Sequence, residues 1–158
     1  MTRRRTSYRR ANVVVTGDMD LSALTERLRP LTKKEVHIGM QGNAELAMIA
    51  GVHEYGSVKM GIPARSFIGS GKKKAQAAIT KLVKKGVTEI ALGDRTVQSL
   101  LDEIGELGKV RMLKNFDRIK LPGLSPIYAR FKTGKKLLVA DKELRDSIVF
   151  KVVQKRRR

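Results

Sequence analysis

A histidine followed by a glutamate is the first feature of the sequence that could indicate catalysis. His53-Glu54 matches the beginning of the HExxH motif, in which two histidines on one helical face bind zinc and the glutamate acts as general base. The second histidine is missing, because Ser57 occupies its position. The chain has two histidines and no cysteine, which excludes a zinc–cysteine site, a thiol nucleophile and a disulfide framework. The HExxH interpretation therefore fails.

A glycine-rich turn before a lysine suggests a second kind of chemistry, phosphate binding. Gly69 to Lys72 reads GSGK, but Ser66 replaces the earlier glycine of the phosphate-loop pattern and Lys73 replaces its closing serine or threonine. No GxSxG nucleophile elbow is present. Three acidic residues near one helical face are a candidate metal site or, alternatively, an exposed acidic patch: Asp102, Glu103 and Glu106. We therefore expect a protein that is not an enzyme and that holds no cofactor.

Positive charge dominates the composition. The 158 residues include 34 Lys and Arg against 15 Asp and Glu, a formal net charge of +19. Hydrophobic residues make up 41% of the chain, which is enough for the core of one domain. No apolar run approaches the roughly 18 residues of a membrane span, and no apolar signal segment follows the charged N-terminus. We expect a protein made in the cytoplasm, without a membrane partner, whose charge suits an acidic or polyanionic partner.

The charge is concentrated in separate segments. Residues 1–12 and 151–158 each carry five basic residues and no acid, residues 59–85 carry eight and no acid, and residues 89–106 hold five acids against Arg95. Such polarity suits a protein that contacts copies of itself or a charged neighbour. The candidate intersubunit or DNA-facing residues are Arg3, Arg4, Arg5, Lys73, Lys74, Lys81, Lys84, Lys85, Arg156, Arg157 and Arg158, with Asp102, Glu103 and Glu106 as the candidate acidic counter-surface.

Hydrophobic periodicity predicts an α+β fold in which two long helices pack on a small mixed or antiparallel sheet. The predicted strands cover residues 13–15, 35–40 and 147–153. The first predicted helix begins at the cap Asp20 and ends at Pro30, and the second begins at the cap Asn43 and ends at Gly51 or Tyr55. Two long helices follow, one over 72–91 and one capped by Asp94. Long loops are expected over 56–71 and 119–136. The expected organisation is a basic flexible arm over 1–12, a single domain over 13–153 and a basic tail over 154–158.

The helix predicted over 72–91 has two distinct faces. Its apolar positions share one arc, and Lys73, Lys74, Lys81, Lys84 and Lys85 fall on the opposite arc. In the following helix, Gly105 and Gly108 allow either close packing or a bend. His37, in a predicted apolar strand, is interpreted as a structural histidine rather than a ligand.

Two short segments carry a resemblance to a known family. Residues 52–56 read VHEYG, and residues 62–68 read IPARSFI. This resembles the signature of tailed-bacteriophage virion-morphogenesis proteins, the tail-completion or neck family, in which a helix ends in His/Asn-Glu-Phe/Tyr-Gly and Ile-Pro-Ala-Arg-Pro-Phe opens a long helix. The matching residues are His53, Glu54, Tyr55, Gly56, Ile62, Pro63, Ala64, Arg65 and Phe67.

The resemblance extends over most of residues 20–153. Residues 104–119 resemble the second long helix of the family, residues 121–126 its proline-containing loop, and residues 137–148 its closing segment. The chain departs from the pattern at Ser66, where the family usually has proline, and at Asp141-Lys142, where it usually has Thr-Gly.

The resemblance implies a structural virion protein located in the neck or tail. Such a subunit forms a homo-oligomeric ring at the head-proximal end of the tail, as a completion, terminator or head–tail joining protein. Its partners are copies of itself, the neighbouring connector or neck proteins and the tail-tube proteins, with non-specific contact to DNA in the lumen. In that ring, the basic segment 72–85 and the acidic segment 89–106 are expected to meet across a heterologous contact.

The motif residues also predict local structure. Pro63 restricts its own φ and the conformation of Ile62, which gives a rigid entry to the helix. Phe67 and Ile68 are expected to anchor that turn, and Arg65 is expected to pair with Glu54 across the loop and clamp two helix ends.

The alternative function is non-sequence-specific nucleic-acid binding through the basic arms. In this interpretation the terminal arginines contact phosphates, and affinity falls steeply with salt concentration. Base-specific recognition is not expected, because aromatic residues make up only 4% of the chain.

Overall fold

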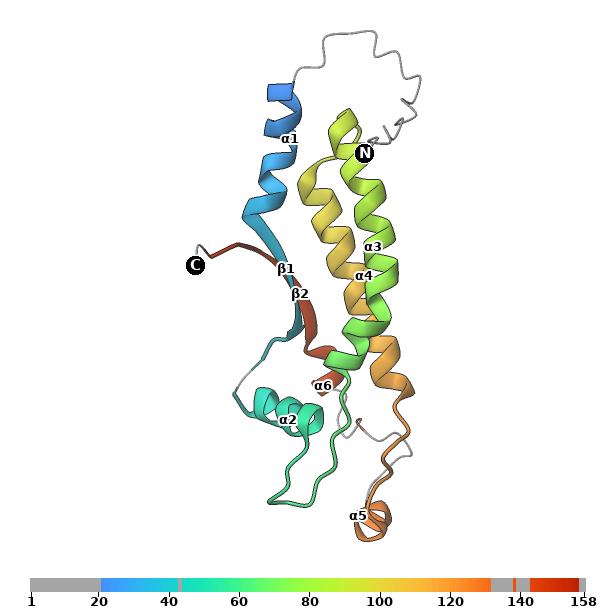
Figure 1. Ribbon diagram of the computed structural model, residues 1–158. Helices are drawn as coiled ribbons and strands as arrows, with labels where there is room; N and C mark the ends of the chain where they lie inside the picture. Colours follow the sequence, from blue (N-terminus) through green and yellow to red (C-terminus); the bar gives the residue numbers. More distant parts are fainter. Residues whose placement is uncertain (1–20, 43, 132–137, 139–142, 157–158) are drawn as a thin grey trace, which may run out of the picture.

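Two long helices form an antiparallel pair that runs along most of the molecule (Figure 1). The computed structural model describes residues 21–42, 44–131, 138 and 143–156. The pair consists of α3 (Ile68–Leu92) and α4 (Val97–Arg118). The other elements are α1 (Leu21–Lys33), β1 (Lys34–Met40), α2 (Ala44–Tyr55), α5 (Pro126–Phe131), α6 (Glu143–Asp146) and β2 (Ile148–Gln154).

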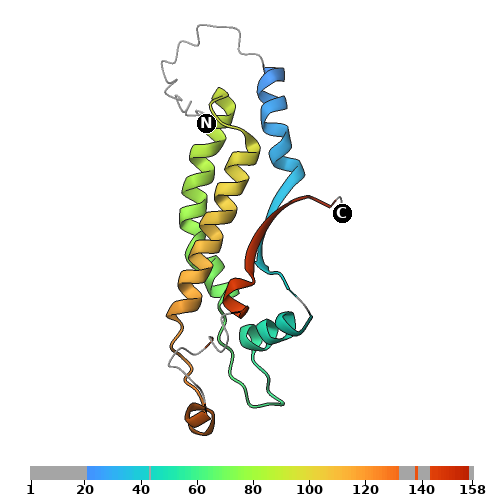
Figure 2. The ribbon, with the colours of Figure 1, turned by 180° about the vertical axis from the view of Figure 1, so that it is seen from behind.

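The two strands form an antiparallel sheet that packs against the helix pair, mainly along α4 (Figures 1 and 2). Ile38 pairs with Phe150, and both side chains face α4. By the alternation of strands, Glu35 and His37 lie on the outer face of the sheet. The predicted single α+β domain with a small antiparallel sheet and two long helices is confirmed. The strand predicted over 13–15 lies outside the described residues.

Glycines allow these elements to approach closely. A Cβ atom at Gly86 would overlap Leu100 on α4, and a Cβ atom at Gly105 would overlap the ring of Phe150 on β2. Gly108 meets Ile38 of β1 in the same way. Of the two roles considered for the glycines of α4, close packing is therefore the one observed.

The core lies where the helix pair, the sheet and α2 meet. Phe67 and Ile148 are the largest fully buried side chains there. Leu100 is also fully buried, but it packs against Gly86 of α3, outside this cluster. The rings of Phe67 and Phe116 pack edge to face, with centroids 5.1 Å apart. The core cluster also includes Ala50, Met112, Leu138 and Leu144.

Two predicted helix boundaries were wrong. The first helix continues through Pro30 to Lys33. None of its residues is buried, so water can solvate the carbonyl that Pro30 leaves unpaired. The second wrong boundary is the cap of the second long helix, which is not Asp94. The backbone N–H of Asp94 instead bonds to the carbonyl of Glu89 and completes the C-terminal cap of α3. Thr96 is the N-cap of α4, and its side chain accepts a hydrogen bond from the N–H of Ser99.

The loop predictions also needed correction. α3 begins at Ile68, so the loop after α2 ends four residues earlier than predicted. The segment expected to be a loop over 119–136 contains α5, and residues 132–136 lie outside the described part. β2 extends to Gln154, one residue into the predicted tail. Short elements without an amphipathic repeat, such as α5, give little periodic signal in a sequence.

The glycine contacts yield a stability prediction. We expect Gly105→Ala to lower the free energy of unfolding by about 1–3 kcal/mol, because the new methyl group must displace the Phe150 ring. Gly51→Ala in α2 is the matched control, since nothing lies within 4 Å of a Cβ atom there. The control should be neutral or stabilising by about 0.5–1 kcal/mol through helix propensity. Urea unfolding measures both, and equal effects would contradict the close-packing role.

Candidate functional site

The carboxylate of Glu54, near the end of α2, caps the beginning of α3. Its Oε2 accepts hydrogen bonds from the backbone N–H groups of Phe67 (2.9 Å) and Ile68 (2.8 Å). Its Oε1 accepts from the N–H of Gly69 (2.8 Å) and from the hydroxyl of Ser66 (2.7 Å). One negative charge thus satisfies three N–H groups at the positive end of a helix dipole. The hydroxyl of Ser66 thus takes part in this cap.

The cap changes the acidity of Glu54. Burial of the carboxyl group disfavours its charged form and would by itself raise the pKa. The hydrogen bonds from Ser66, Gly69, Ile68 and Phe67 outweigh this effect, so the pKa of Glu54 is lowered. The charged form therefore stabilises the fold.

Arg65 does not pair with Glu54, so the predicted clamp is wrong. The Arg65 side chain is buried and reaches the loop that follows α4, where Nε donates to the carbonyl of Pro122 (2.8 Å) and Nη2 to that of Gly123 (2.7 Å). The prediction failed because the N–H groups of α3 and these loop carbonyls are better placed partners. Glu54 and Arg65 instead fix two different segments, the start of α3 and the 122–123 loop.

Phe67 takes the anchoring role predicted for it, and Asn115 supports it from α4. Asn115 is buried, and its Nδ2 donates to the carbonyl of Phe67 (3.0 Å) and to the hydroxyl of Ser70 (2.7 Å). Its Oδ1 accepts from Nζ of Lys74 at 2.5 Å. The side chain of Lys74 therefore points toward α4 and is not part of the lysine stripe predicted on α3. Asn115 was not among the predicted site residues, although a polar residue three positions after Met112, on the buried face of α4, was a usable signal.

The remaining motif residues shape the loop between α2 and α3. Gly56 has a φ of 77°, and a Cβ atom there would lie 2.9 Å from the backbone of Ala64 and Ile62. Only glycine fits this position without strain. Ser57 and Ile62 exchange backbone hydrogen bonds, and the N–H of Arg65 bonds to the carbonyl of His53 (2.6 Å). Tyr55 and Pro63 are exposed on this loop region.

Large apolar side chains stay exposed on the segments that the motif holds. They belong to α2, the loop after it, the loop after α4, and α5, which all lie at the lower end of the molecule in Figure 1. Val58 is fully exposed, and Tyr55 and Phe131 are more than four-fifths exposed. We call this the apolar end: Met48, Tyr55, Val58, Met60, Leu121, Ile127 and Phe131. Exposed apolar side chains on adjoining segments are typical of protein–protein contact surfaces.

The lysine stripe on α3 is partly as predicted. Lys73, Lys81 and Lys84 line a shallow, open hollow on this helix together with Gln76 and Thr80. This set of residues, the basic face, offers ammonium, amide and hydroxyl groups to phosphates or carboxylates.

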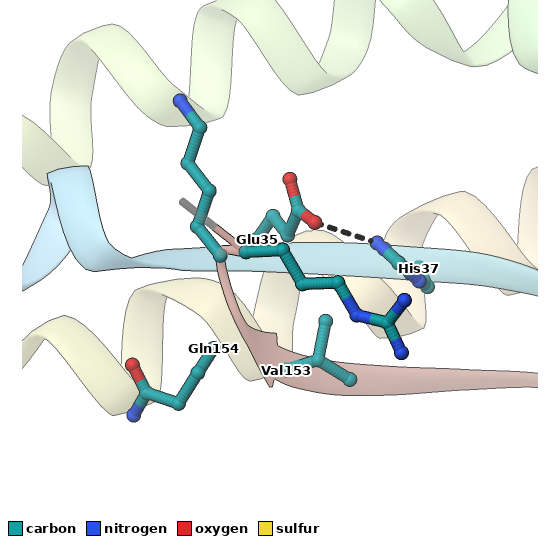
Figure 3. A pocket seen from close by; sticks show the side chains of 6 residues that line it. Glu35, His37, Val153 and Gln154 are labelled. Atoms are coloured by element: carbon teal, nitrogen blue, oxygen red, sulfur yellow. Dashed lines mark hydrogen bonds and ion pairs between the residues drawn. The ribbon is translucent and has the colours of Figure 1, made fainter. Parts of the chain in front are cut away.

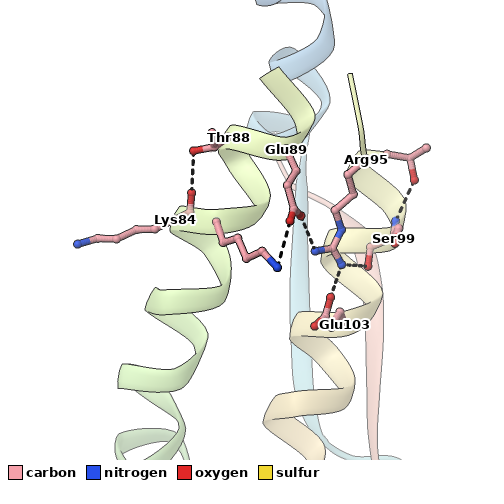
Figure 4. A network of polar contacts seen from close by, with 8 residues as sticks. Lys84, Thr88, Glu89, Arg95, Ser99 and Glu103 are labelled. Atoms are coloured by element: carbon pink, nitrogen blue, oxygen red, sulfur yellow. Dashed lines mark hydrogen bonds and ion pairs between the residues drawn. The ribbon is translucent and has the colours of Figure 1, made fainter. Parts of the chain in front are cut away.

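Lys85 belongs to an ion-pair network that joins the ends of α3 and α4 (Figure 4). Its Nζ lies 3.4 Å from Glu89, which also contacts Arg95 at 3.3 Å. Arg95 in turn pairs with Glu103, which raises the pKa of Arg95 against the opposing effect of desolvation. One member of the predicted acidic counter-surface is thus engaged within the subunit.

Two of the basic and two of the acidic candidates border one groove instead of lying on separate surfaces. Lys81 and Lys85 of α3 and Glu103 and Glu106 of α4 line the same apolar groove between the two helices. Asp102, the third acidic candidate, accepts a hydrogen bond from Gln98 (3.0 Å) and does not line this groove.

The outer face of the sheet has a second hollow, lined in part by the beginning of the C-terminal tail (Figure 3). His37 lies there, exposed, with Nε2 3.0 Å from Oε1 of Glu35 on the same strand. Its interpretation as a structural histidine rather than a ligand stays a prediction. Lys155 and Arg156 contribute to the same hollow. Arg3, Arg4, Arg5, Arg157 and Arg158 lie outside the described residues.

Two further findings concern metals and membranes. Within residues 21–42, 44–131, 138 and 143–156, no three acidic or histidine side chains gather closely enough to hold a metal ion. In the same part of the chain, every helix is too short or too polar to cross a bilayer.

The lowered pKa of Glu54 predicts a pH-dependent loss of stability. A carboxyl group with a lowered folded pKa stabilises above its unfolded pKa, and this contribution disappears as pH falls through the folded value. We expect Glu54→Gln to lower the free energy of unfolding by about 1–2 kcal/mol near pH 7, as loss of a helix cap does. The difference from wild type should shrink as pH falls through the acid range. Glu26→Gln, on the exposed surface of α1, is the control, and a pH-independent difference would contradict the cap.

The contacts of Arg65 predict a local effect on the loop after α4. Arg65→Lys keeps the charge but loses the planar fork that binds two carbonyls at once. We expect tryptic cleavage after Lys120 to become several-fold faster in this variant, because the loop is no longer held. Arg111→Lys, at an exposed position on α4, should leave the cleavage rate unchanged. Equal rates in wild type and Arg65→Lys would contradict this role.

Comparison with known proteins assigns no family or function to this chain. The chain matches no protein-family model, no curated protein and no solved structure. The resemblance to phage tail-completion proteins therefore stays a prediction from the residues of the motif.

Proposed function

We propose that this protein is a structural subunit of a tailed-phage virion. It forms a homo-oligomeric ring in the neck or at the head-proximal end of the tail, as a tail-completion, terminator or head–tail joining protein. Its partners are copies of itself and the neighbouring connector, neck and tail-tube proteins. The proposal starts from the VHEYG and IPARSFI segments and their resemblance to that family.

The observation that carries the proposal is the way the motif residues hold the apolar end. Glu54 ties the end of α2 to α3, and Arg65 ties the loop before α3 to the 122–123 loop. The apolar side chains of the adjoining segments remain in water in the single subunit. A rigid frame that presents exposed apolar groups suits docking onto another protein, because little conformational entropy is lost on binding.

The basic face of α3 favours a second candidate function, non-specific nucleic-acid binding. Lys73, Lys81 and Lys84 are exposed together on one helix of a chain with a net charge of +19. In a ring, this face would meet the phosphates of DNA in the lumen without reading sequence. In a free monomer, it would act together with the basic arms.

Measurement of assembly separates the two functions. We expect the protein, alone or mixed with its neighbouring virion proteins, to form a discrete ring of more than two subunits in mass photometry and negative-stain microscopy. Val58→Ser with Met60→Ser should weaken ring closure or docking at least about tenfold, because apolar contact area is lost. Leu92→Ser, which is also exposed but lies at the opposite end of α3, is the matched control.

Two results would contradict the assembly proposal. One is a strict monomer that never docks on virion proteins. The other is salt-sensitive DNA binding by a monomer that is lost when residues 1–12 and 156–158 are deleted, with no assembly under any condition. The second result would support the nucleic-acid-binding alternative. Ring formation that survives deletion of both arms supports the virion role.

A further inference from the structure

The groove between α3 and α4 has an apolar floor and a charged rim. The floor is formed by Ala78 and Leu82 of α3 and by Leu107 and Val110 of α4. On the opposite side of the helix pair, Gly105 and Gly108 contact the sheet, so the groove faces away from the sheet. Among the described residues, no other element covers it. Four half-buried aliphatic side chains therefore line a surface that the single chain leaves open.

The rim carries opposite charges on its two sides. Lys81 and Lys85 lie on the α3 side, and Glu103 and Glu106 lie on the α4 side. At the end nearest the helix turn, Lys85 and Glu103 are already engaged through Glu89 and Arg95 (Figure 4). Lys81 and Glu106 have no partner among the described residues. Each of them therefore has a free charge to offer across an interface.

We propose that this groove is a contact between two copies of the chain related by a two-fold axis. The axis runs along the groove, parallel to the helices. It places α3 of one copy over α4 of the other, and the two copies are not shifted along the helix direction. Lys81 of each copy then faces Glu106 of its partner, which forms two equivalent ion pairs. The aliphatic floors of the two grooves meet between them, as in the core of a four-helix bundle.

Charge balance favours a second copy over other occupants of the groove. The chain carries +19 in total, so two copies repel each other over most of their surfaces. The two lysines and two glutamates of the rim cancel, and the floor is uncharged. This is a surface on which a second basic chain meets no net charge. A nucleic acid or an acidic protein would find a better partner in the basic face around Lys73 and Lys84.

The contact does not rest on the proposed ring. A two-fold contact uses the same surface on both subunits and closes with two copies, so it cannot propagate a ring by itself. The basic segment 72–85 and the acidic segment 89–106 were expected to meet in a heterologous contact. In the dimer proposed here they meet in a self-complementary contact instead. Ring closure, where it occurs, uses other surfaces of the subunit. A variant that loses the dimer but keeps the ring, or loses the ring but keeps the dimer, would show that the two contacts are independent.

Charge reversal tests the contact in the full-length protein. Sedimentation velocity at about 0.15 M salt, where the long-range repulsion is screened, should show wild-type protein sedimenting as a dimer at about 100 µM. Lys81→Glu and Glu106→Lys should each weaken dimerisation about tenfold or more, because each creates two like-charge contacts. Lys84→Glu on α3 and Asp102→Lys on α4 are the matched controls, since neither residue lines the groove. Circular dichroism checks that every variant is folded.

Mixing the Lys81→Glu and Glu106→Lys chains gives the decisive measurement. In an equimolar mixture, the introduced glutamate of the first chain meets the introduced lysine of the second, and the native Glu106 of the first meets the native Lys81 of the second. A heterodimer as stable as the wild-type dimer is therefore expected. A second pair of variants, Leu82→Ser and Leu107→Ser, should weaken dimerisation without rescue on mixing. A wild-type monomer at the highest concentration, equal effects of the control reversals, or failure of the mixture to recover would each overturn the proposal.

Discussion

The hydrogen bonds of one carboxylate determine how the lower half of the molecule is arranged. Glu54 satisfies three N–H groups at the beginning of α3, a helix of 25 residues. This attaches the end of α2 to the first turn of α3, where Phe67 enters the core against Phe116. Asn115 binds the carbonyl of Phe67 from α4, so the same turn is fixed from two sides. Glu54 and Asn115 thus hold the first turn of α3, and Arg65, two residues before Phe67, holds the 122–123 loop.

The fixed joint between α2 and α3 explains how this chain can keep apolar side chains exposed, because the segments that carry them are held in place and do not fold back onto the core. Arg65 holds the 122–123 loop, and the positive φ of Gly56 sets the turn after α2. The adjoining segments carry the apolar end. The other surfaces of the molecule differ in character: α3 shows a lysine-rich face, and the groove between α3 and α4 carries balanced charges. This division into apolar, basic and balanced surfaces suits a protein that acts through several contacts at once.

Elements with a strong periodic signal were predictable, whereas short elements and caps were not. β1, α2, β2 and the two long helices lie close to their predicted positions, because amphipathic repeats and alternation show in the sequence. The extension of α1 through Pro30 was not predicted, because it depends on the solvent exposure of that helix. The short helix α5 was not predicted either, since six residues give little periodic signal. Within the candidate site, the importance of Glu54, Arg65 and Phe67 was foreseen, but the partners of Glu54 and Arg65 were not.

The fold class, the long helices and the division of charge along the chain were predictable from the amino-acid sequence, because they depend on composition and local periodicity. The pairs of groups that meet in space depend on how the elements pack. Glu54 binds the N–H groups of α3 rather than Arg65, and Lys74 binds Asn115. Two lysines of α3, Lys81 and Lys85, border one groove with the two glutamates Glu103 and Glu106 of α4. Such choices depend on distances between segments far apart in the chain. A sequence pattern indicates which residues are polar or apolar, but the packing of helices determines the distances between them.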